Sequence, residues 1–286
     1  MPLCEADGKI WGVLAGQVDD EKYWTACDGL YQRLVELGQS KVMQEDVKDN
    51  KRGAYPVLNI GVTYGPGASR PSVLHARRPD GTPGKFTTVA EELLQDPNLR
   101  LLASFQSYCY SFWCPNIYRD YVEKLNCLWD HFPDLRRNFS RSVFPCCALN
   151  CGPDAWTKRH RDCMNRADGW CAITALGSFN PTQGGHLLLP ELRLAIQFPP
   201  GSVILIPSAT VTHANIPVAA GDVRGSITQY AAGGLFRFID NNFMTKTDLQ
   251  KKDEDLYKKN EKDNEYRWLN AQKNFSSLND FTEPAL

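Results

Sequence analysis

The feature that most constrains the fold is a run of short β-rich segments, broken by Gly and Pro, between Ser142 and Phe243. The segments are Val143–Leu149, Trp170–Ser178, His186–Leu189, Arg193–Phe198, Ser202–Ile206, Thr210–Ile216 and Gly225–Ala231. Roughly seven or eight strands at this spacing predict a double-sheet jelly roll. We therefore expect an α+β protein with a double-stranded β-helix (jelly-roll) core of two antiparallel sheets.

The residues before this core predict helices that brace one sheet from outside. We expect strands at 10–17 and 57–64, a helix capped by Asp19 or Asp20, and two or three helices in 87–131, the first of them capped by Thr88. One domain should then span residues 1–243, with a helical and strand buttress in 1–140 and the catalytic core in 141–243. Residues 244–286 are rich in charge and predict a helical extension whose aromatic side chains dock on the domain.

Composition narrows the class of protein. With 42% hydrophobic residues, the 286-residue chain can bury a sizeable core. It has no apolar run of transmembrane length, and its acidic start is unlike a signal peptide, so we expect a soluble intracellular protein without a membrane partner. Its ten cysteines include no CxxC pair, which favours free core thiols over a disulfide framework or a zinc site.

Two histidines and one carboxylate form the strongest chemical signal. His160 and Asp162 are separated by one residue, and alternation along a strand would place both on one side, with Arg161 facing away. His213 follows a later strand and would lie across the sheet from them. Two imidazoles and one carboxylate leave the opposite face of a metal open, as a non-haem Fe(II) site requires. The alternative is a set of scattered polar core residues.

A basic residue follows the distal histidine. The guanidinium of Arg224 can hold the far carboxylate of 2-oxoglutarate through two hydrogen bonds, and Ser226 would point the same way and add a hydroxyl. For Arg224 alone, a surface salt bridge is the alternative. The residues in this order predict an Fe(II) centre that uses 2-oxoglutarate and O2.

At these residues the chain resembles the Fe(II)/2-oxoglutarate dioxygenases, and within them the TET/JBP branch, especially its fungal members. The resemblance covers roughly residues 140–240. The run from His160 to Asn165 matches that branch's H-x-D-x-x-N, and the run from Arg224 to Tyr230 matches its R-x-S-x(3)-Y/F. The resemblance implies that Asn165 hydrogen-bonds the target base and that Tyr230 stacks on it after the nucleotide has been flipped out of the duplex. Asn150 resembles an asparagine placed near 2-oxoglutarate in other nucleic-acid demethylases, although a turn-capping role is an equal alternative.

The activity that the resemblance implies is oxidation of a methyl group on a base in double-stranded DNA. Decarboxylation of 2-oxoglutarate would yield succinate and drive conversion of 5-methylcytosine to 5-hydroxymethylcytosine and further products. The branch usually carries a His two residues after the stacking aromatic, where this chain has Ala232. Loss of that donor puts strict cytosine selectivity in doubt, so N6-methyladenine demethylation is a second candidate.

Local basic clusters are the feature that points to DNA, because the net charge is only -1. The clusters are Arg70, Arg77, Arg78 and Lys85 in the Gly/Pro-rich loop 65–85, Arg136, Arg137 and Arg141 after a helix, and Lys158, Arg159, Arg161 and Arg166 around the metal motif. We expect Arg159 and Arg161 to contact substrate phosphates. A DNA substrate would imply nuclear residence, and we expect a monomer.

Three alternatives remain at this point. The first is a protein or small-molecule 2-oxoglutarate-dependent hydroxylase, which has no need of these cations. The second is a non-catalytic reader of nucleic acid or protein. The third is a cupin-like protein that holds Mn(II) or Ni(II) in the same ligands.

Overall fold

The computed structural model describes residues 1–45, 52–65 and 67–281, and its elements are strands in antiparallel sheets with helices packed against them. The strands are β1 (Pro2–Cys4), β2 (Ile10–Gly16), β3 (Val57–Thr63), β4 (Ser72–Leu74), β5 (Cys146–Asn150), β6 (Cys171–Ser178), β7 (Leu187–Leu189), β8 (Leu194–Ile196), β9 (Val203–Ile206), β10 (Ala214–Asn215) and β11 (Val223–Tyr230). The helices are α1 (Glu21–Gln39), α2 (Lys41–Gln44), α3 (Thr87–Gln95), α4 (Pro97–Trp113), α5 (Pro115–His131), α6 (Gly233–Asp240), α7 (Lys246–Lys252) and α8 (Glu254–Gln272). Short 3-10 turns occupy Pro190–Leu192 and Leu278–Phe281.

The strands form two antiparallel sheets, which confirms the predicted α+β class and jelly-roll core. The large sheet has the order β1-β2-β9-β6-β11-β5-β3-β4, and the small sheet has the order β10-β7-β8. Side chains of β6, β7 and β9, together with Phe198, make one apolar cluster. The sheets therefore enclose a core of their own.

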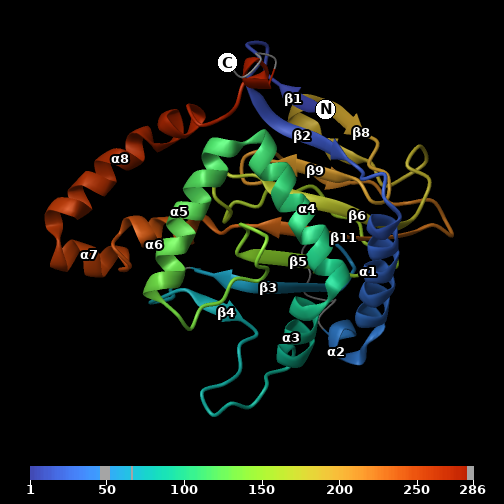
Figure 1. Ribbon diagram of the computed structural model, residues 1–286, viewed down its shortest axis with the longest axis horizontal. Helices are drawn as coiled ribbons and strands as arrows, with labels where there is room; N and C mark the ends of the chain where they lie inside the picture. The colour runs from blue at the N-terminus through green and yellow to red at the C-terminus, as the bar shows by residue number, and fades with distance from the viewer. Residues whose placement is uncertain (46–51, 66, 282–286) are drawn as a thin grey trace.

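Helices α1 and α4 lie across one face of the large sheet (Figure 1), as predicted for the N-terminal buttress. Asp20 caps α1, because its side chain accepts from the backbone N–H groups of Lys22 and Tyr23. The predicted cap at Thr88 is wrong: α3 begins at Thr87, and no side chain caps it. Asp96 caps α4 instead, with Pro97 in the first turn, where its missing N–H costs nothing.

A buried polar network joins α4 to the sheet. Gln106 on α4 donates to Thr174 Oγ1 at 2.7 Å and accepts from Gln229 Nε2 at 2.9 Å. Ser142 Oγ donates to Gln229 Oε1 at 2.7 Å. Because the network satisfies these buried groups mutually, it fixes the position of α4 on the sheet as well as adding stability.

The C-terminal extension is helical, as predicted, but its aromatic residues do not all dock. Figure 1 shows α8 standing away from the body of the molecule before the chain returns toward β1 and β2. Tyr266 and Trp268 are 52% and 44% exposed. The return is held by the backbone, where Ile10 N donates to Ser276 O at 2.8 Å.

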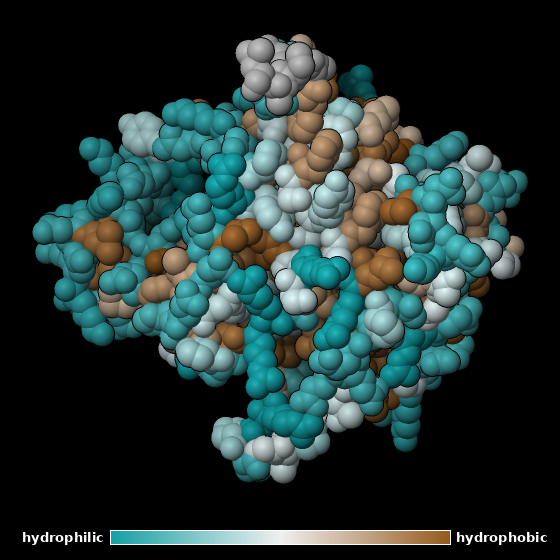
Figure 2. Space-filling view, viewed as in Figure 1, coloured by the Kyte–Doolittle hydropathy of each residue, from teal (hydrophilic) through white to brown (hydrophobic). Residues whose placement is uncertain are grey.

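The loop between β4 and α3 projects from the lower edge of the large sheet in Figure 1, and Figure 2 shows that its surface is largely hydrophilic. All ten cysteines are free thiols, and seven of them are buried as expected, whereas Cys127 and Cys163 are exposed. Among the described residues, no helix combines the length and the apolar character needed to cross a membrane.

Candidate metal and co-substrate site

The two histidines are brought together by their own backbones. His160 N donates to His213 O, and His213 N donates to His160 O, each at 3.0 Å. Residues that exchange both hydrogen bonds in an antiparallel pair carry their side chains on the same side. The imidazole centroids accordingly lie 4.3 Å apart. The prediction that the motif lies on a strand is wrong, because this pair is an isolated bridge between irregular segments.

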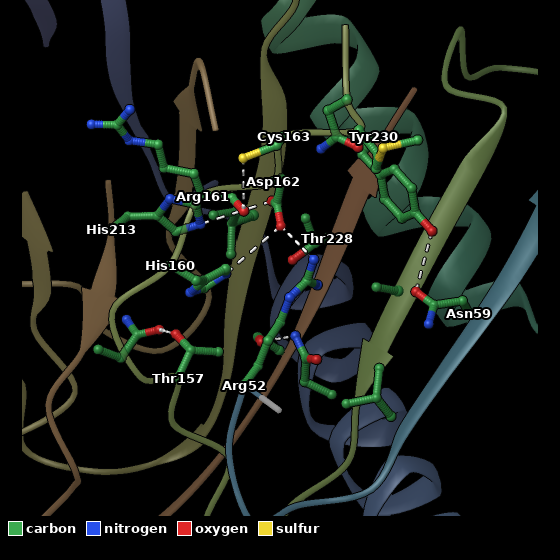
Figure 3. Close-up of a pocket in the computed structure, with 18 of the residues that line it drawn as sticks. Arg52, Asn59, Thr157, His160, Arg161, Asp162, Cys163, His213, Thr228 and Tyr230 are labelled. Atoms are coloured by element: carbon green, nitrogen blue, oxygen red, sulfur yellow. Dashed lines mark hydrogen bonds and ion pairs between the residues drawn. The ribbon is translucent and has the colours of Figure 1, made fainter. Parts of the chain in front are cut away.

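Asp162 completes a set of three ligand atoms. Its backbone N donates to Ser208 O at 2.9 Å, which places the carboxylate beside both rings. Oδ1 lies 3.7 Å from His160 Nε2, and Oδ2 lies 3.9 Å from His213 Nε2. The three ligand atoms all fall within 4.8 Å of one another. Figure 3 shows the three side chains converging at one wall of the cavity.

Backbone carbonyls fix the tautomer of both imidazoles. His160 Nδ1 lies 2.7 Å from Lys158 O, and His213 Nδ1 lies 3.0 Å from Val211 O. A carbonyl only accepts, so each Nδ1 carries the proton and each Nε2 lone pair is left for a metal. Burial, followed by the neighbouring His160, lowers the pKa of His213 and keeps its ring neutral. The donor set fits Fe(II).

Alternation along β11 places Arg224, Ser226, Thr228 and Tyr230 on one face of the large sheet. Arg224 is only 2% exposed. It sits opposite Gly177 of β6, where an added Cβ would lie 2.2 Å from Val223 O, so this close approach of the strands needs glycine. The sequence prediction that Ser226 points the same way as Arg224 is borne out by the strand register.

The guanidinium of Arg224 has unused hydrogen-bonding capacity. Nη1 donates to Ala155 O at 2.6 Å, but the buried Nε has no hydrogen-bond partner among the described residues, and none of their carboxylates pairs with the group. Burial lowers the pKa of Arg224 to about 10, although Tyr55 and Asp154 act in the opposite direction. A buried cation with an orphaned donor fits the carboxylate of a dicarboxylate co-substrate.

Ser226 and Asn150 lie next to Arg224 in the sheet. They are paired in the register of β11 and β5, and Asn150 Nδ2 donates to Ser226 Oγ at 2.9 Å. This bond leaves the Asn150 carbonyl and the serine hydroxyl proton able to bind a ligand. The sequence prediction placed both residues beside the co-substrate, and both line the same cavity as the metal ligands.

The cavity has a volume of about 700 Å3 and uses one face of the large sheet as its floor. One row of that floor runs across four strands through Asn59, Ala148, Thr228 and Ile173. The predicted residues that line it are His160, Arg161, Asp162, His213, Asn150, Ser226, Asn165 and Tyr230. Arg224 is buried and is not among the lining residues, and Arg159 is exposed outside the cavity.

Sequence reasoning missed several lining residues, which include Arg52, Tyr55, Asn59, Thr157 and Thr228. Thr228 follows from the same alternation that identified Ser226. Asn59 lies on a strand that was predicted, but its place in the cavity depends on pairing with β5, which a single sequence does not reveal. Arg52 precedes that strand, and it is part of no recognisable sequence motif.

Hydrogen bonds orient the two residues expected to contact a base. Asn165 Nδ2 donates to Ser208 Oγ at 3.1 Å, which leaves Asn165 Oδ1 as an acceptor. The Tyr230 hydroxyl donates to Asn59 Oδ1 at 3.2 Å, and Figure 3 shows its ring directed toward Asn59. Ala232 also lines this part of the cavity.

The basic residues around the motif are less available than expected. Arg161 pairs with Glu191 at 2.8 Å. Arg166 does not lie at a rim: it is largely buried, pairs with Asp168 at 2.7 Å and contacts Asp120. Ion pairs thus hold two of the four cations, while Lys158 and Arg159 are exposed and enter no ion pair with the described residues.

Three of the four basic residues predicted in 65–85 are also ion-paired within the molecule, whereas Arg78 donates, among the described residues, only to Thr82 Oγ1 and Pro83 O. Arg70 pairs with Asp134 at 2.5 Å, and Arg77 pairs with Glu91 at 2.5 Å. Lys85 lies 3.4 Å from Glu45. Each of these acids is distant in sequence from its partner. The sequence therefore predicted more unpaired positive charge in residues 65–85 than the structure has.

Comparisons with known proteins find no matching family model and no curated relative. Among solved structures, NgTET1 in complex with 5mC DNA is 14% identical, with 82% of this chain and 76% of that chain covered and a TM-score of 0.48. AviO1 from Streptomyces viridochromogenes is 15% identical, with 78% and 90% covered and a TM-score of 0.35. An oxidoreductase of the 2OG-Fe(II) oxygenase family from Burkholderia pseudomallei is 17% identical, with 64% and 71% covered and a TM-score of 0.32. These sequence identities and TM-scores are too low to support a conclusion about the chemistry of the site.

Proposed function

We propose that this protein is an Fe(II)- and 2-oxoglutarate-dependent dioxygenase that oxidises the methyl group of a flipped-out modified base in DNA. The observation that carries the proposal is the pairing, in one region of the fold, of a three-donor metal set with a buried arginine that has an unsatisfied N–H. Three protein donors leave metal positions for a bidentate keto acid and O2. When bound, iron and 2-oxoglutarate supply the activation of O2 that oxidation of a methyl group needs.

The chain's own residues would hold the co-substrate beside the metal ligands. Arg224 would donate to the far carboxylate of 2-oxoglutarate, and Ser226 would add its hydroxyl. The burial of Arg224 strengthens this contact, because water does not compete there for the guanidinium. His160, Asp162 and His213 would hold Fe(II) beside it.

Further lining residues of the cavity suit a nucleobase. A volume of about 700 Å3 is within the usual range of ligand pockets. Because Asn165 Nδ2 is committed to Ser208, its Oδ1 can accept from an exocyclic amino group, which 5-methylcytosine and N6-methyladenine both carry. Tyr230 would stack on the base and offset part of the cost of extruding it. Ala232 leaves room for the larger purine.

The exposed Lys158 and Arg159 support a polyanionic substrate, since each precedes the metal motif and enters no ion pair with the described residues. If both contact phosphates, binding should weaken as salt rises. The ion pairs of Arg161 and of the loop cations favour a second candidate, a protein or small-molecule hydroxylase with the same iron chemistry.

The test combines the protein with Fe(II), 2-oxoglutarate and duplexes that carry 5-methylcytosine, N6-methyladenine or no modification. Succinate and the nucleosides of the digested duplex are measured by mass spectrometry. Oxidised base together with duplex-dependent succinate is the expected result. Succinate without any base product would reject the DNA substrate in favour of the hydroxylase, and absence of succinate under all conditions would reject the dioxygenase.

A further inference from the structure

Arg52 reaches the metal ligands from a distant part of the chain. It lies between α2 and β3, and its Nη2 donates to Asp162 Oδ1 at 2.5 Å. Figure 3 shows its side chain directed at the Asp162 carboxylate. Arg52 belongs neither to the metal motif nor to the residues assigned to the co-substrate.

The backbone around Arg52 is held in place by the segment that leads to His160. Lys158 N donates to Arg52 O at 2.7 Å. At the next residue, Gly53, an added Cβ would lie 2.6 Å from Trp156 O and would also meet the Tyr55 ring at 2.4 Å. The two segments are therefore packed too closely for a side chain at residue 53. Arg52 is anchored at its main chain, unlike an arginine on a free surface loop.

We propose that Arg52 is a positioning residue that orients Asp162 for the metal. This positioning role rests on the metal site of the proposed function. A carboxylate turns easily about its last torsion and can offer either oxygen, or both, to a cation. By holding Oδ1, Arg52 leaves Oδ2, which lies 3.9 Å from His213 Nε2, as the oxygen that binds the metal. A planar guanidinium with a permanent charge suits this task better than an ammonium.

Two effects of Arg52 on the metal oppose each other. Its positive charge repels a dication, whereas its hydrogen bond holds the ligand in the binding orientation. Its side chain is 47% exposed, so solvent screens the repulsion. Removing partners that orient metal ligands commonly weakens metal affinity by about 10- to 100-fold. We expect the loss of orientation to be the larger effect.

The test is a titration of the metal-free full-length protein with Co(II), followed by the visible absorption of the bound ion. Arg52→Gln should weaken Co(II) binding by about 10- to 100-fold and change the shape of the spectrum, because Asp162 can then bind through both oxygens. Arg52→Lys should restore part of the affinity. Arg77→Gln is the matched control, since it breaks the exposed ion pair with Glu91 and should leave Co(II) binding unchanged.

Circular dichroism of each variant shows whether it is folded. If Arg52→Gln folds and binds Co(II) with unchanged or higher affinity and an unaltered spectrum, the positioning role is wrong while the metal site stands. If the unmodified protein binds no Co(II), the metal site, the proposed function and this role all fail. Reduced affinity in Arg52→Gln supports the role even if no methylated duplex is oxidised.

Discussion

Replacing Arg224 with methionine should make the protein more stable and strongly weaken its use of 2-oxoglutarate. Burial lowers the pKa of Arg224 to about 10. At about 1.4 kcal/mol per tenfold change, this depression costs the folded state roughly 3 kcal/mol. The cost applies in full at neutral pH, where both the folded and the unfolded chain hold the proton. It is relieved only as the pH rises through the folded pKa, because the unfolded chain then binds more protons.

Methionine removes this cost and fills much of the same volume. It also removes the hydrogen bond to Ala155 O, which offsets about 1 kcal/mol of the gain. The free energy of unfolding should therefore rise by roughly 2 kcal/mol, which for a chain of this size corresponds to about 5 °C in Tm. Urea unfolding and thermal denaturation measure both quantities.

The same change removes the group that would bind the far carboxylate. Two charge-assisted hydrogen bonds at about 1.5–3 kcal/mol each predict that the KM for 2-oxoglutarate rises by at least about 100-fold. Arg224→Lys is the matched control: it keeps the charge but loses the planar pair of donors, so its KM should lie between the two. A methionine variant that is less stable by 2 kcal/mol or more, with an unchanged KM, would show that Arg224 is a structural residue, and the argument would be refuted.

Three further changes test other parts of the structure. Asn165→Ala should reduce base oxidation more than succinate formation without DNA, because only the base loses a partner; equal losses in the two assays would argue against a base contact. Gln106→Leu should lower the free energy of unfolding in urea by about 2–4 kcal/mol, since Gln229 keeps a buried amide with fewer partners, and an unchanged midpoint would contradict this. Burial acts to raise the pKa of Asp168, but hydrogen bonds and charge from Arg166 outweigh it and hold that pKa below its usual value. The stability from this pair should thus be present above about pH 4 and be lost as pH falls through the lowered pKa. Asp168→Asn should therefore reduce the loss of unfolding free energy at acid pH. An unchanged pH dependence of stability would reject the role of this ion pair.

Sequence reasoning identified the residues of the site whose arrangement depends on local periodicity. Period-two alternation placed Ser226 on the same side as Arg224, and the register of β11 with its neighbours bears this out. Alternation also led to the expectation that His160 and Asp162 share a strand. They do share a side, but isolated backbone hydrogen bonds put them there instead of a regular strand: His160 pairs with His213, and Asp162 N donates to Ser208 O.

Long-range pairing explains most of what the sequence could not predict. Asn59 reaches the cavity only because β3 pairs with β5 across about 90 residues of chain, a register that local patterns do not encode. Glu191, which pairs with Arg161, and Asp120, which contacts Arg166, are likewise remote in sequence, so the basic cluster looked freer than it is. Asp168, the other partner of Arg166, lies only two residues along the chain. The aromatic residues of the charged helix were expected to dock on the domain, yet Trp268 on α8 is 44% exposed.

The fixed charges around the cavity give a reason for the metal and the dicarboxylate to bind together. Asp162 contributes one negative charge, while Arg52 and Arg224 contribute two positive charges, so this set carries a net charge of about +1. Fe(II) alone would raise that charge to about +3, and 2-oxoglutarate alone would lower it to about -1. With both present it returns to about +1, so each ligand reduces the electrostatic cost of the other, and this coupling must be reciprocal. The residual positive charge lies in the cavity that a negatively charged strand would have to approach. The buried Arg224 would therefore do more than bind the co-substrate: its charge would set a balance that is completed only when metal and co-substrate occupy the site.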